Sequence, residues 1–483
     1  MIWAVLQQVG GQVTSMLAFL GLAALLRPSD FGLIGMAGAW LAILNAFCET
    51  GFGAAIIHRD RVSGDHLSTT FALNLAVGAA LTLLGVALSW PAEFYFHAPG
   101  LQPVMAALSV GFLVRAFGLT QAALAQRELR FRALALRDLV ANFVGGAIGL
   151  ILALAGYGVW SLVGMSLVSA VVSTAMLWRV AHWRPRRSEV SRKAAADLWP
   201  YGSRVLGFNL FKAFSQNTDR LIIGPLLSAH QVGLYTLASR AIIFPVSTFA
   251  GALGNYLFPQ VSRLQSDRTG LRAVYRAVMI VTLSIVLPGL ATVVVLTPVL
   301  VALLGDRWRD ATPVMQVLAL VALAQAIISP VGQLMKGLGR PGWLLRWSIG
   351  FTLFTAAALW FGAKWGLMGA TVGYAAVHLA ALPVILLIGW RLTGVGIAQF
   401  LAILWRPALS AIVLAVCAGV AAHYAAGWGR PAVAAIAITV GSLYLAALTR
   451  LNPEFAALAV RELRKVRLVA ENPTNLAGNG GPG

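Results

Sequence analysis

The sequence predicts an all-α, multi-pass membrane protein with about fourteen transmembrane helices. Apolar segments of about 20 residues, the length that crosses a bilayer core, recur along most of the chain. Charged residues make up only 11% of the 483 residues, whereas a soluble protein carries about a quarter. Lys and Arg are concentrated in alternate connections between the apolar segments, as a chain that crosses a membrane repeatedly requires.

The apolar segments give the predicted helices in order. Turn-forming sequences separate them, such as Arg27-Pro28-Ser29-Asp30 and Gly339-Arg340-Pro341-Gly342. The predicted helices span 3–26, 31–57, 67–90, 102–124, 135–155, 157–178, 199–226, 232–257, 273–300, 311–335, 343–362, 366–390, 404–424 and 431–450.

The distribution of Lys and Arg predicts the orientation. Connections that follow even-numbered helices, together with the C-terminal end, hold 26 Lys and Arg, and the other connections hold 5. By the positive-inside rule, both termini are expected in the cytoplasm. A net charge of +20 in a soluble protein would suggest a nucleic-acid partner. Here the basic residues are explained by membrane orientation, and no nucleic-acid partner is expected.

Two short motifs repeat and predict an internal symmetry. Asp30-Phe31-Gly32-Leu33 recurs loosely as Gln231-Val232-Gly233-Leu234, and Gly158-Val159-Trp160-Ser161-Leu162-Val163-Gly164 as Gly366-Leu367-Met368-Gly369-Ala370-Thr371-Val372-Gly373. Both spacings cover six helices, so two pseudo-symmetric six-helix lobes followed by two C-terminal helices are expected. The predicted parts are an N-lobe at 1–178, a cytoplasmic linker at 179–198, a C-lobe at 199–390, two helices with a basic segment at 391–470, and a disordered tail at 471–483.

The predicted helix 199–226 is unusual because it carries charges that are expensive within a bilayer. On a helical wheel its polar residues share an arc of roughly 160°. Leu206, Leu210 and Phe214 lie outside that arc. A polar stripe along a whole membrane helix indicates a wet, cationic interior. The residues on it are Arg204, Asn209, Lys212, Ser215, Gln216, Asp219 and Arg220.

Several short motifs are informative in combination. They are Asp30-Phe31-Gly32, Gly51-Phe52-Gly53-Ala54-Ala55-Ile56-Ile57-His58-Arg59, Arg127-Glu128-Leu129-Arg130-Phe131-Arg132, Gly156-Tyr157-Gly158-Val159-Trp160, Asp219-Arg220-Leu221-Ile222-Ile223-Gly224, Gly233-Leu234-Tyr235, Phe258-Pro259-Gln260-Val261-Ser262-Arg263-Leu264-Gln265 and Gly305-Asp306-Arg307-Trp308. Together they resemble the polysaccharide-transporter branch of the MOP (multidrug/oligosaccharidyl-lipid/polysaccharide) flippases, nearest to the colanic acid exporter type. The resemblance runs from about residue 8 to 390 and depends on the combination of motifs.

The resemblance implies a flippase in the bacterial inner membrane. Its substrate would be an oligosaccharide repeat unit linked to undecaprenyl pyrophosphate, used for exopolysaccharide or lipopolysaccharide synthesis. The expected partners are this lipid-linked substrate, membrane lipids and the polysaccharide polymerase machinery. Transport would proceed by alternating access through a cationic central cavity, without catalysis. No cofactor is expected, and coupling of transport to a proton or sodium gradient stays open.

Candidate substrate residues follow from these expectations. Arg and Lys suit the oxygens of a pyrophosphate head group, and Gln12 and Gln216 lie on polar faces that could hydrogen-bond sugars. Each cation also has a structural alternative: Arg220 as a partner of Asp219, Arg240 at the outer interface, and the others in ion pairs between helices. The candidate cations are Arg115, Lys212, Arg220 and Arg240.

Glu49 and Asp219 are the acids best placed within the bilayer. Either could couple transport to an ion gradient, or hold helices together as a charge partner. Cys48 and Cys417 lie in apolar helices without the Cys/His clusters of a metal site, and are expected to be packing residues.

Three alternatives stay open from sequence. A MOP-type exporter of a lipid II-like precursor or a drug shares the expected fold, although a cationic interior disfavours cationic drugs. A polysaccharide polymerase or ligase would carry a large external loop, whereas the longest external connection predicted here is 91–103. A non-transporting scaffold would leave the intramembrane charges unexplained.

Overall fold

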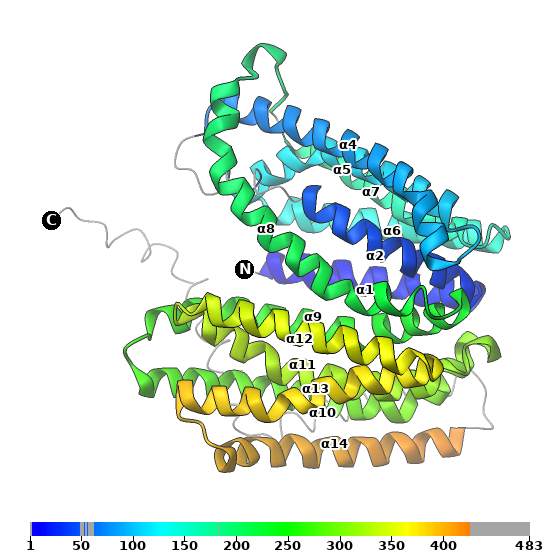
Figure 1. Cartoon of the computed structure of the whole chain (residues 1–483), viewed down its shortest axis with the longest axis vertical. Helices are drawn as coiled ribbons and strands as arrows, with labels where there is room; N and C mark the ends of the chain where they lie inside the picture. The colour runs from blue at the N-terminus through cyan, green and yellow to red at the C-terminus, as the bar shows by residue number, and fades with distance from the viewer. Residues whose placement is uncertain (1, 49–52, 54–55, 57–61, 182, 426–483) are drawn as a thin grey trace. The chain divides into compact units, whose positions relative to one another are not determined.

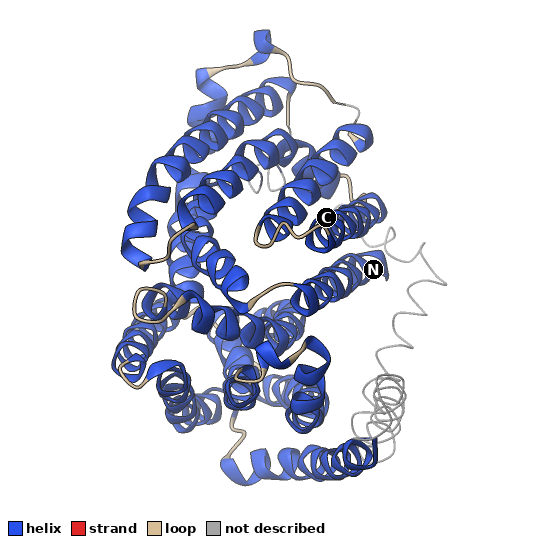
Figure 2. Cartoon of the chain, turned by 90° about the vertical axis from the view of Figure 1, so that its right-hand side faces the viewer, coloured by secondary structure: helices blue, strands red, loops and turns tan. Residues whose placement is uncertain are grey.

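The computed structural model describes residues 2–48, 53, 56, 62–181 and 183–425, and within these ranges it contains helices and connecting segments without any strand (Figures 1 and 2). The long helices are α1 (Ile2–Leu25), α2 (Pro28–Cys48), α4 (Gly64–Phe96), α5 (Leu101–Arg127), α6 (Phe131–Leu154), α7 (Trp160–Val180), α8 (Arg192–Ile223), α9 (Ala229–Arg263), α10 (Arg268–Leu304), α11 (Ala311–Gly337), α12 (Pro341–Ala363), α13 (Gly366–Thr393) and α14 (Ile397–Ala425). Two short 3₁₀ helices, η1 (Arg187–Glu189) and η2 (Asp306–Trp308), lie in connections.

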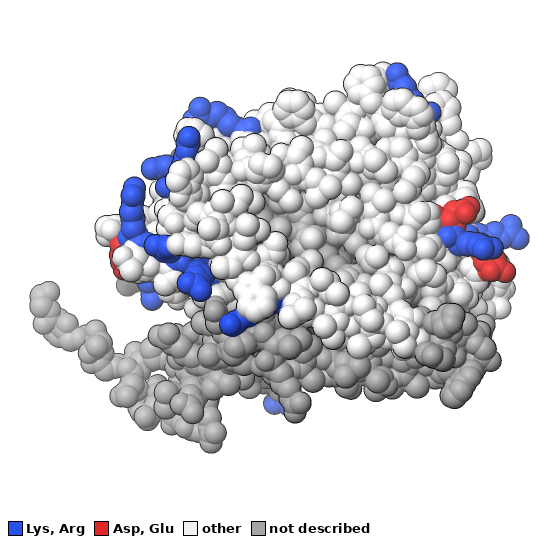
Figure 3. Space-filling view, turned by 90° about the horizontal axis from the view of Figure 1, so that it is seen from below, with Lys and Arg blue, Asp and Glu red and all other residues white. Residues whose placement is uncertain are grey.

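The all-helical membrane fold is confirmed. Eleven of these helices are long and apolar enough to cross a membrane. Of the fourteen predicted segments, all but 431–450 fall on helices of the structure, and 431–450 lies outside the described residues. α8 is not among the eleven because charged residues interrupt its apolar sequence. On the face shown in Figure 3, charged side chains lie near its edges, and the broad surface between them is almost uncharged.

Several predicted helix boundaries differ from the structure, and two of them change the assignment of charged residues. α6 begins at Phe131 and not at 135, so Arg132 lies in the helix and not in the connection before it. The helix starts early because Leu134 is buried against Ala125 and Leu177, which gives its first turn an apolar contact. α8 begins at Arg192 and not at 199, so the connection between α7 and α8 is shorter than the predicted linker.

The described chain divides into two compact units. The first comprises 1–238, 304–314 and 351–373, and the second comprises 239–303, 315–350 and 374–483 as far as the described residues extend. These bounds follow contacts in space, whereas the predicted lobes followed the sequence repeat. The lobe boundaries therefore stay a prediction.

In the first unit, α4 packs on α5, α6 on α7, and α1 on α6, while α2 contacts α4, α5 and α8. Small residues permit the closest of these approaches. A Cβ atom on Gly145 of α6 would lie 2.7 Å from the Met165 carbonyl oxygen of α7, and one on Gly149 would lie 3.2 Å from the Ser161 carbonyl oxygen. This GxxxG pair sets α6 directly against the α7 backbone.

The second unit has an apolar core of its own. Val261 of α9, Met279 and Leu283 of α10, Leu334 of α11 and Ile385 of α13 are buried together there. Side chains of α14 join the same cluster. The Gln265 side chain also donates a 2.8 Å hydrogen bond to the Gly337 carbonyl oxygen, which ties the end of α9 to the end of α11.

Candidate functional site

The polar stripe predicted for the seventh helix lies on α8 in the first unit. Lys212 and Gln216, one turn apart, have exposed side chains, and Asp219 is half-buried. Phe214, on another face of α8, is 49% exposed. The helix therefore presents a polar face and an apolar face to its surroundings, which is how a helix between water and lipid is built.

The end of α8 toward Gly224 is closed. Thr218, Leu221 and Ile223 are buried, the last of them completely. The exposure of the α8 side chains thus decreases from Lys212 toward the end of the helix that the predicted topology places outside. Ser215, between the two regions, shares a 2.8 Å hydrogen bond with Thr352 of α12, within the same unit.

Arg115 of α5 shows the same gradient. Leu101 and Val104 share its helix face and are buried, whereas Arg115 and Gln126 on that face are exposed. α5 runs in the direction opposite to α8 in the predicted topology, so its buried end is again the outer one. Arg115 and Lys212 belong to helices that both pack against α2.

Gln12 of α1 is half-buried, and residues further along its face are progressively covered. Phe19, Ala23 and Leu26 on that face are buried. The first unit thus carries accessible polar groups of α1, α5 and α8 at mid-helix and dense packing at the predicted outer ends. These groups could contact a polar or anionic ligand where they are accessible, away from the predicted outer ends.

Asp219 and Arg220 were predicted to be either functional or paired with each other. The structure gives Asp219 a partner that the sequence analysis missed: the Tyr235 hydroxyl of α9 donates a 2.9 Å hydrogen bond to Asp219 Oδ2. Tyr235 is completely buried. The other carboxylate oxygen, Oδ1, accepts a 2.8 Å hydrogen bond from the backbone N–H of Arg220. Arg220 itself is half-buried.

The remaining predicted residues are not part of this group. Arg240 lies on α9 in the second unit, half-buried, with its guanidinium carbon 5.9 Å from the centre of the Phe244 ring. This stacking is a cation–π contact. Glu49, the other proposed coupling acid, lies outside the described residues.

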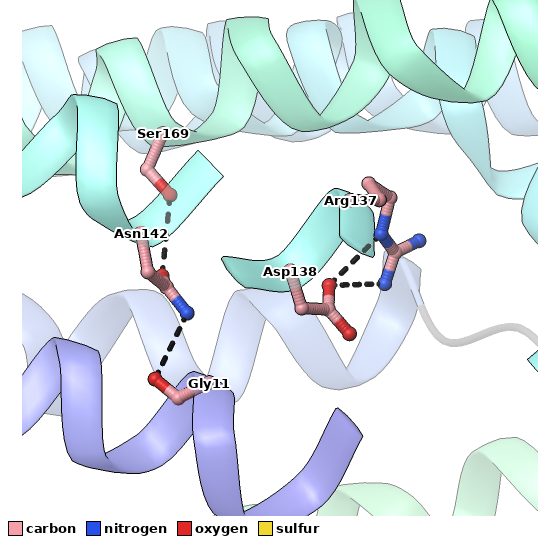
Figure 4. A network of polar contacts seen from close by, with 5 residues as sticks. All are labelled: Gly11, Arg137, Asp138, Asn142 and Ser169. Carbon is pink, nitrogen blue, oxygen red and sulfur yellow. Dashed lines mark hydrogen bonds and ion pairs between the residues drawn. The ribbon is translucent and has the colours of Figure 1, made fainter. Parts of the chain in front are cut away.

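A second polar network, which we did not predict as a site, joins α1, α6 and α7 (Figure 4). The Asn142 amide donates to the Gly11 carbonyl oxygen at 3.1 Å, and the Ser169 hydroxyl donates to the Asn142 side-chain oxygen at 3.5 Å. One turn away on α6, Arg137 and Asp138 form an ion pair at 2.5 Å. The predicted helix 135–155 has this pair in its first turn, whereas in the structure it lies in the second turn of α6. The spacing of Asp138 and Asn142, which puts both on one helix face, is the signal that could have revealed it.

No group of three or more His, Cys, Asp or Glu side chains within the described ranges is arranged to hold a metal ion. Neither Cys48 nor Cys417 forms a disulfide in the described part of the chain, and Cys48 is buried. The candidate site therefore offers fixed charges and hydrogen-bonding groups, which suit binding and orientation of a ligand.

Comparison with known proteins identifies the family. Residues 22–313, more than half of the chain, match the family described as polysaccharide biosynthesis protein. The chain belongs to this family. The resemblance inferred from its motifs is thereby confirmed.

Relatives of this polysaccharide biosynthesis protein include the succinoglycan biosynthesis transport protein ExoT of Rhizobium meliloti, which is 24% identical over 86% of this chain and 84% of the relative. The lipopolysaccharide biosynthesis protein WzxC of Escherichia coli is 24% identical over 74% of this chain and 73% of its own. Among solved structures, the lipid II flippase MurJ matches with a TM-score of 0.71 at 12% identity, covering 96% of this chain and 100% of the other. An inward-facing multidrug-resistance transporter of the MATE family matches with a TM-score of 0.63 at 17% identity, covering 81% and 98%. These structures show the multi-pass fold.

Proposed function

We propose that the protein is a flippase that moves an oligosaccharide repeat unit, linked to undecaprenyl pyrophosphate, across the bacterial inner membrane. Membership of the polysaccharide biosynthesis family supports this proposal, as do relatives whose names describe transport in succinoglycan synthesis and a role in lipopolysaccharide synthesis. The observation that carries it is the accessible cation Lys212 at mid-helix in a membrane-embedded bundle. An uncompensated lysine there costs several kcal/mol, so water or an anion must accompany it.

The proposed roles follow from the chemistry of the substrate. Lys212 and Arg115 bind the pyrophosphate, because cationic side chains replace the hydration that the head group loses. Gln12 and Gln216 hydrogen-bond sugar hydroxyls, and Arg220 adds positive potential along the path. Arg240, in the second unit, stays a candidate from the sequence alone. The polyprenyl chain stays among lipids, which is compatible with the apolar face that α8 presents at Phe214.

The direction of access agrees with the proposed orientation. With both termini in the cytoplasm, the accessible groups of α1, α5 and α8 open toward the side where the lipid-linked precursor is made. The buried helix ends face the outside. Export then requires the outer ends to open and the inner ends to close, which is alternating access.

The rival functions fit less well. A polymerase or ligase would need an external catalytic lobe, but α4 continues to Phe96 and α5 starts at Leu101, so the longest predicted external connection is only a short turn. A drug exporter shares the fold, as the MATE structures demonstrate, yet exposed Lys212 and Arg115 disfavour cationic drugs. A related lipid precursor remains the alternative substrate, because its pyrophosphate would be recognised by the same cations.

Coupling to a proton or sodium gradient is part of the proposal. The acids proposed for it are Glu49 and Asp219, and the structure adds Asp138, which is one turn from Asn142 in the α1–α6–α7 network. A carboxylate that changes partner or proton between two states can link transport to a gradient. Handover of the exported unit to the polymerase machinery is the expected next step.

The decisive experiment measures translocation in inverted membrane vesicles loaded with radiolabelled lipid-linked oligosaccharide. Lys212→Ala and Arg115→Ala are expected to lower the initial rate at least tenfold while membrane abundance stays constant. Lys193→Ala serves as the matched control, because Lys193 is an exposed lysine in the first turn of the same helix. Full transport by both single variants would refute the proposed head-group site.

A further inference from the structure

The two copies of the repeated motif meet in space at one end of the first unit. Gly32 of α2 belongs to the first copy, and Gly233 of α9 belongs to the second. A Cβ atom on Gly32 would overlap the Ala229 carbonyl oxygen, and one on Gly233 would overlap the Pro28 carbonyl oxygen. Each glycine therefore faces the carbonyl four residues before its counterpart. This contact is reciprocal, as a two-fold relation between the repeats requires.

The close contact continues for one turn along both helices. A Cβ atom on Gly35 would overlap the Thr236 hydroxyl oxygen and lie 3.4 Å from the Thr236 Cβ atom. A further turn along α2, Gly38 is exposed and has no neighbour within 4 Å of its Cβ position. Within the first unit, α2 and α9 therefore meet over their predicted outer ends, and the contact ends before Gly38.

Aromatic rings fill the space beside the crossing. Phe31, next to Gly32, is completely buried between Phe19 of α1 and Trp308 of η2. The ring centres are 4.9 Å and 5.3 Å apart, in edge-to-face geometry. Trp308 is also completely buried. These rings cover the outer end of the α1 face that carries Gln12 further in.

A pair of side chains from η2 caps the end of α1. The last carbonyl groups of a helix have no partner within it and carry the negative end of its dipole. Trp308 Nε1 donates a 2.8 Å hydrogen bond to the Ala23 carbonyl oxygen. The Arg307 guanidinium donates to the carbonyl oxygens of Ala24 and Leu25, the latter at 3.2 Å. Arg307 and Trp308 thus tie residues of the predicted second lobe to α1 of the first.

We propose that the Gly32–Gly233 crossing is the outer gate of the substrate path, and that Arg307 and Trp308 form a latch that holds it shut. The proposal rests on the proposed flippase function and assigns to particular residues the closure that this function needs. Release of the latch frees the α1 carbonyls to water, and the two motif copies then separate to let the head group leave. No ion pair has to be broken at the crossing, because it is made of backbone and rings.

A disulfide across the gate tests this proposal. In a background with Cys48→Ser and Cys417→Ser, the pair Gly35→Cys and Thr236→Cys places the Cβ atoms close to the separation that a disulfide accepts, about 3.5–4.5 Å. Oxidation is expected to cross-link the pair and lower translocation at least tenfold, and reduction is expected to restore it. The matched control is Gly53→Cys with Ala123→Cys, whose Cβ atoms would be 3.7 Å apart within the predicted first lobe. Its cross-link should leave translocation unchanged.

Each outcome decides something. Complete cross-linking of the gate pair with undiminished translocation, or an abundant gate-pair protein that never cross-links, would overturn the gate. If the cysteine-free parent protein moves no lipid-linked oligosaccharide under the same conditions, the proposed function fails instead. The latch is then tested by labelling alone.

The labelling experiment places a cysteine at Ser15, deeper than Phe19 on the same α1 face, and adds a membrane-impermeant maleimide from outside. Arg307→Gln and Trp308→Phe each remove latch hydrogen bonds, and each is expected to raise the labelling rate about fivefold. Trp343→Phe is the control, because Trp343 is 62% exposed on α12, away from η2 in sequence. Unchanged labelling in both latch variants would overturn the latch. Arg307 is exposed, so Arg307→Gln remains informative if Trp308→Phe fails to fold.

Discussion

The hydrogen bond from Tyr235 to Asp219 gives a prediction whose magnitude can be worked out. The acceptor is a half-buried carboxylate and the donor is a completely buried phenol, 2.9 Å apart. Hydrogen bonds to charged groups contribute about 1.5–3 kcal/mol in soluble proteins. In membrane bundles, however, interhelical hydrogen bonds average about 0.6 kcal/mol and reach about 1.7, because the unfolded state also finds partners. The charged acceptor favours the upper end of the membrane range, so we expect a coupling energy of about 1.5 kcal/mol.

The assay is a double-mutant cycle of Tyr235→Phe and Asp219→Asn, measured by reversible unfolding in mixed detergent micelles. Each single variant should lose stability, and the double variant should lose little more than the worse of the two. Ser262→Ala is a suitable control for hydroxyl removal. The Ser262 hydroxyl is exposed, and its described hydrogen bond goes to the Phe258 carbonyl oxygen of the same helix. Additive losses, with a coupling energy near zero, would refute the reasoning.

The same variants separate the two roles left open for Asp219. Tyr235→Phe keeps the carboxylate, and Asp219→Asn removes its charge while keeping an acceptor oxygen. If Asp219 couples transport to a gradient, only Asp219→Asn should change the dependence of translocation on that gradient. If Asp219 is structural, both variants should lower abundance together and the surviving protein should respond to the gradient as before.

Further predictions concern coupling and topology. Asp138→Asn should release Arg137 and change the ion dependence of translocation in vesicles; unchanged ion dependence would mean that the pair is a structural element. Asn142→Leu should lower stability by about 1 kcal/mol through the loss of its interhelical hydrogen bonds. A cysteine at Pro99, which is exposed, should react with an impermeant thiol reagent in intact cells, and one at Ser188, also exposed, only after permeabilisation. Reaction at 188 in intact cells would reverse the orientation. Glu189→Gln, which weakens the 2.8 Å contact with Ser68, should lower stability by less than about 1 kcal/mol, as expected for a partly exposed pair.

The helices could be predicted from sequence because each span has to be apolar over a fixed length. Even α8, with its charges, was identified by its length and its flanking turns. The boundaries failed where polar residues sit inside a helix: Arg132, at the end of an Arg-rich stretch that looked like a loop, lies in the first turn of α6. Charge counts alone cannot distinguish an interfacial first turn from a connection.

The contacts between helices were much less predictable. The Asp219–Tyr235 pair crosses a turn between two helices, and nothing in the spacing marks Tyr235 as a partner. Contacts to backbone carbonyl groups, such as that of Trp308 with Ala23, leave no trace in the residue type of the acceptor. His378 is buried, and its Nε2 atom lies 3.3 Å from the Gln325 amide nitrogen, again a partner that only the fold reveals.

The residues of the proposed outer gate differ in chemistry from the residues proposed to line the substrate path, and this difference has a physical reason. In the proposed flippase, the head-group path is lined by fixed cations such as Lys212, because an anion in the bilayer needs compensation. Acids placed at the proposed outer gate would pair with those cations and compete with the substrate. The predicted outer ends of α2 and α9 instead meet through glycines, with Phe31 and Trp308 beside them. Opening such a contact exposes apolar rings and two backbone edges but no buried charge pair. The barrier to opening can then stay low while the cations remain available to the pyrophosphate.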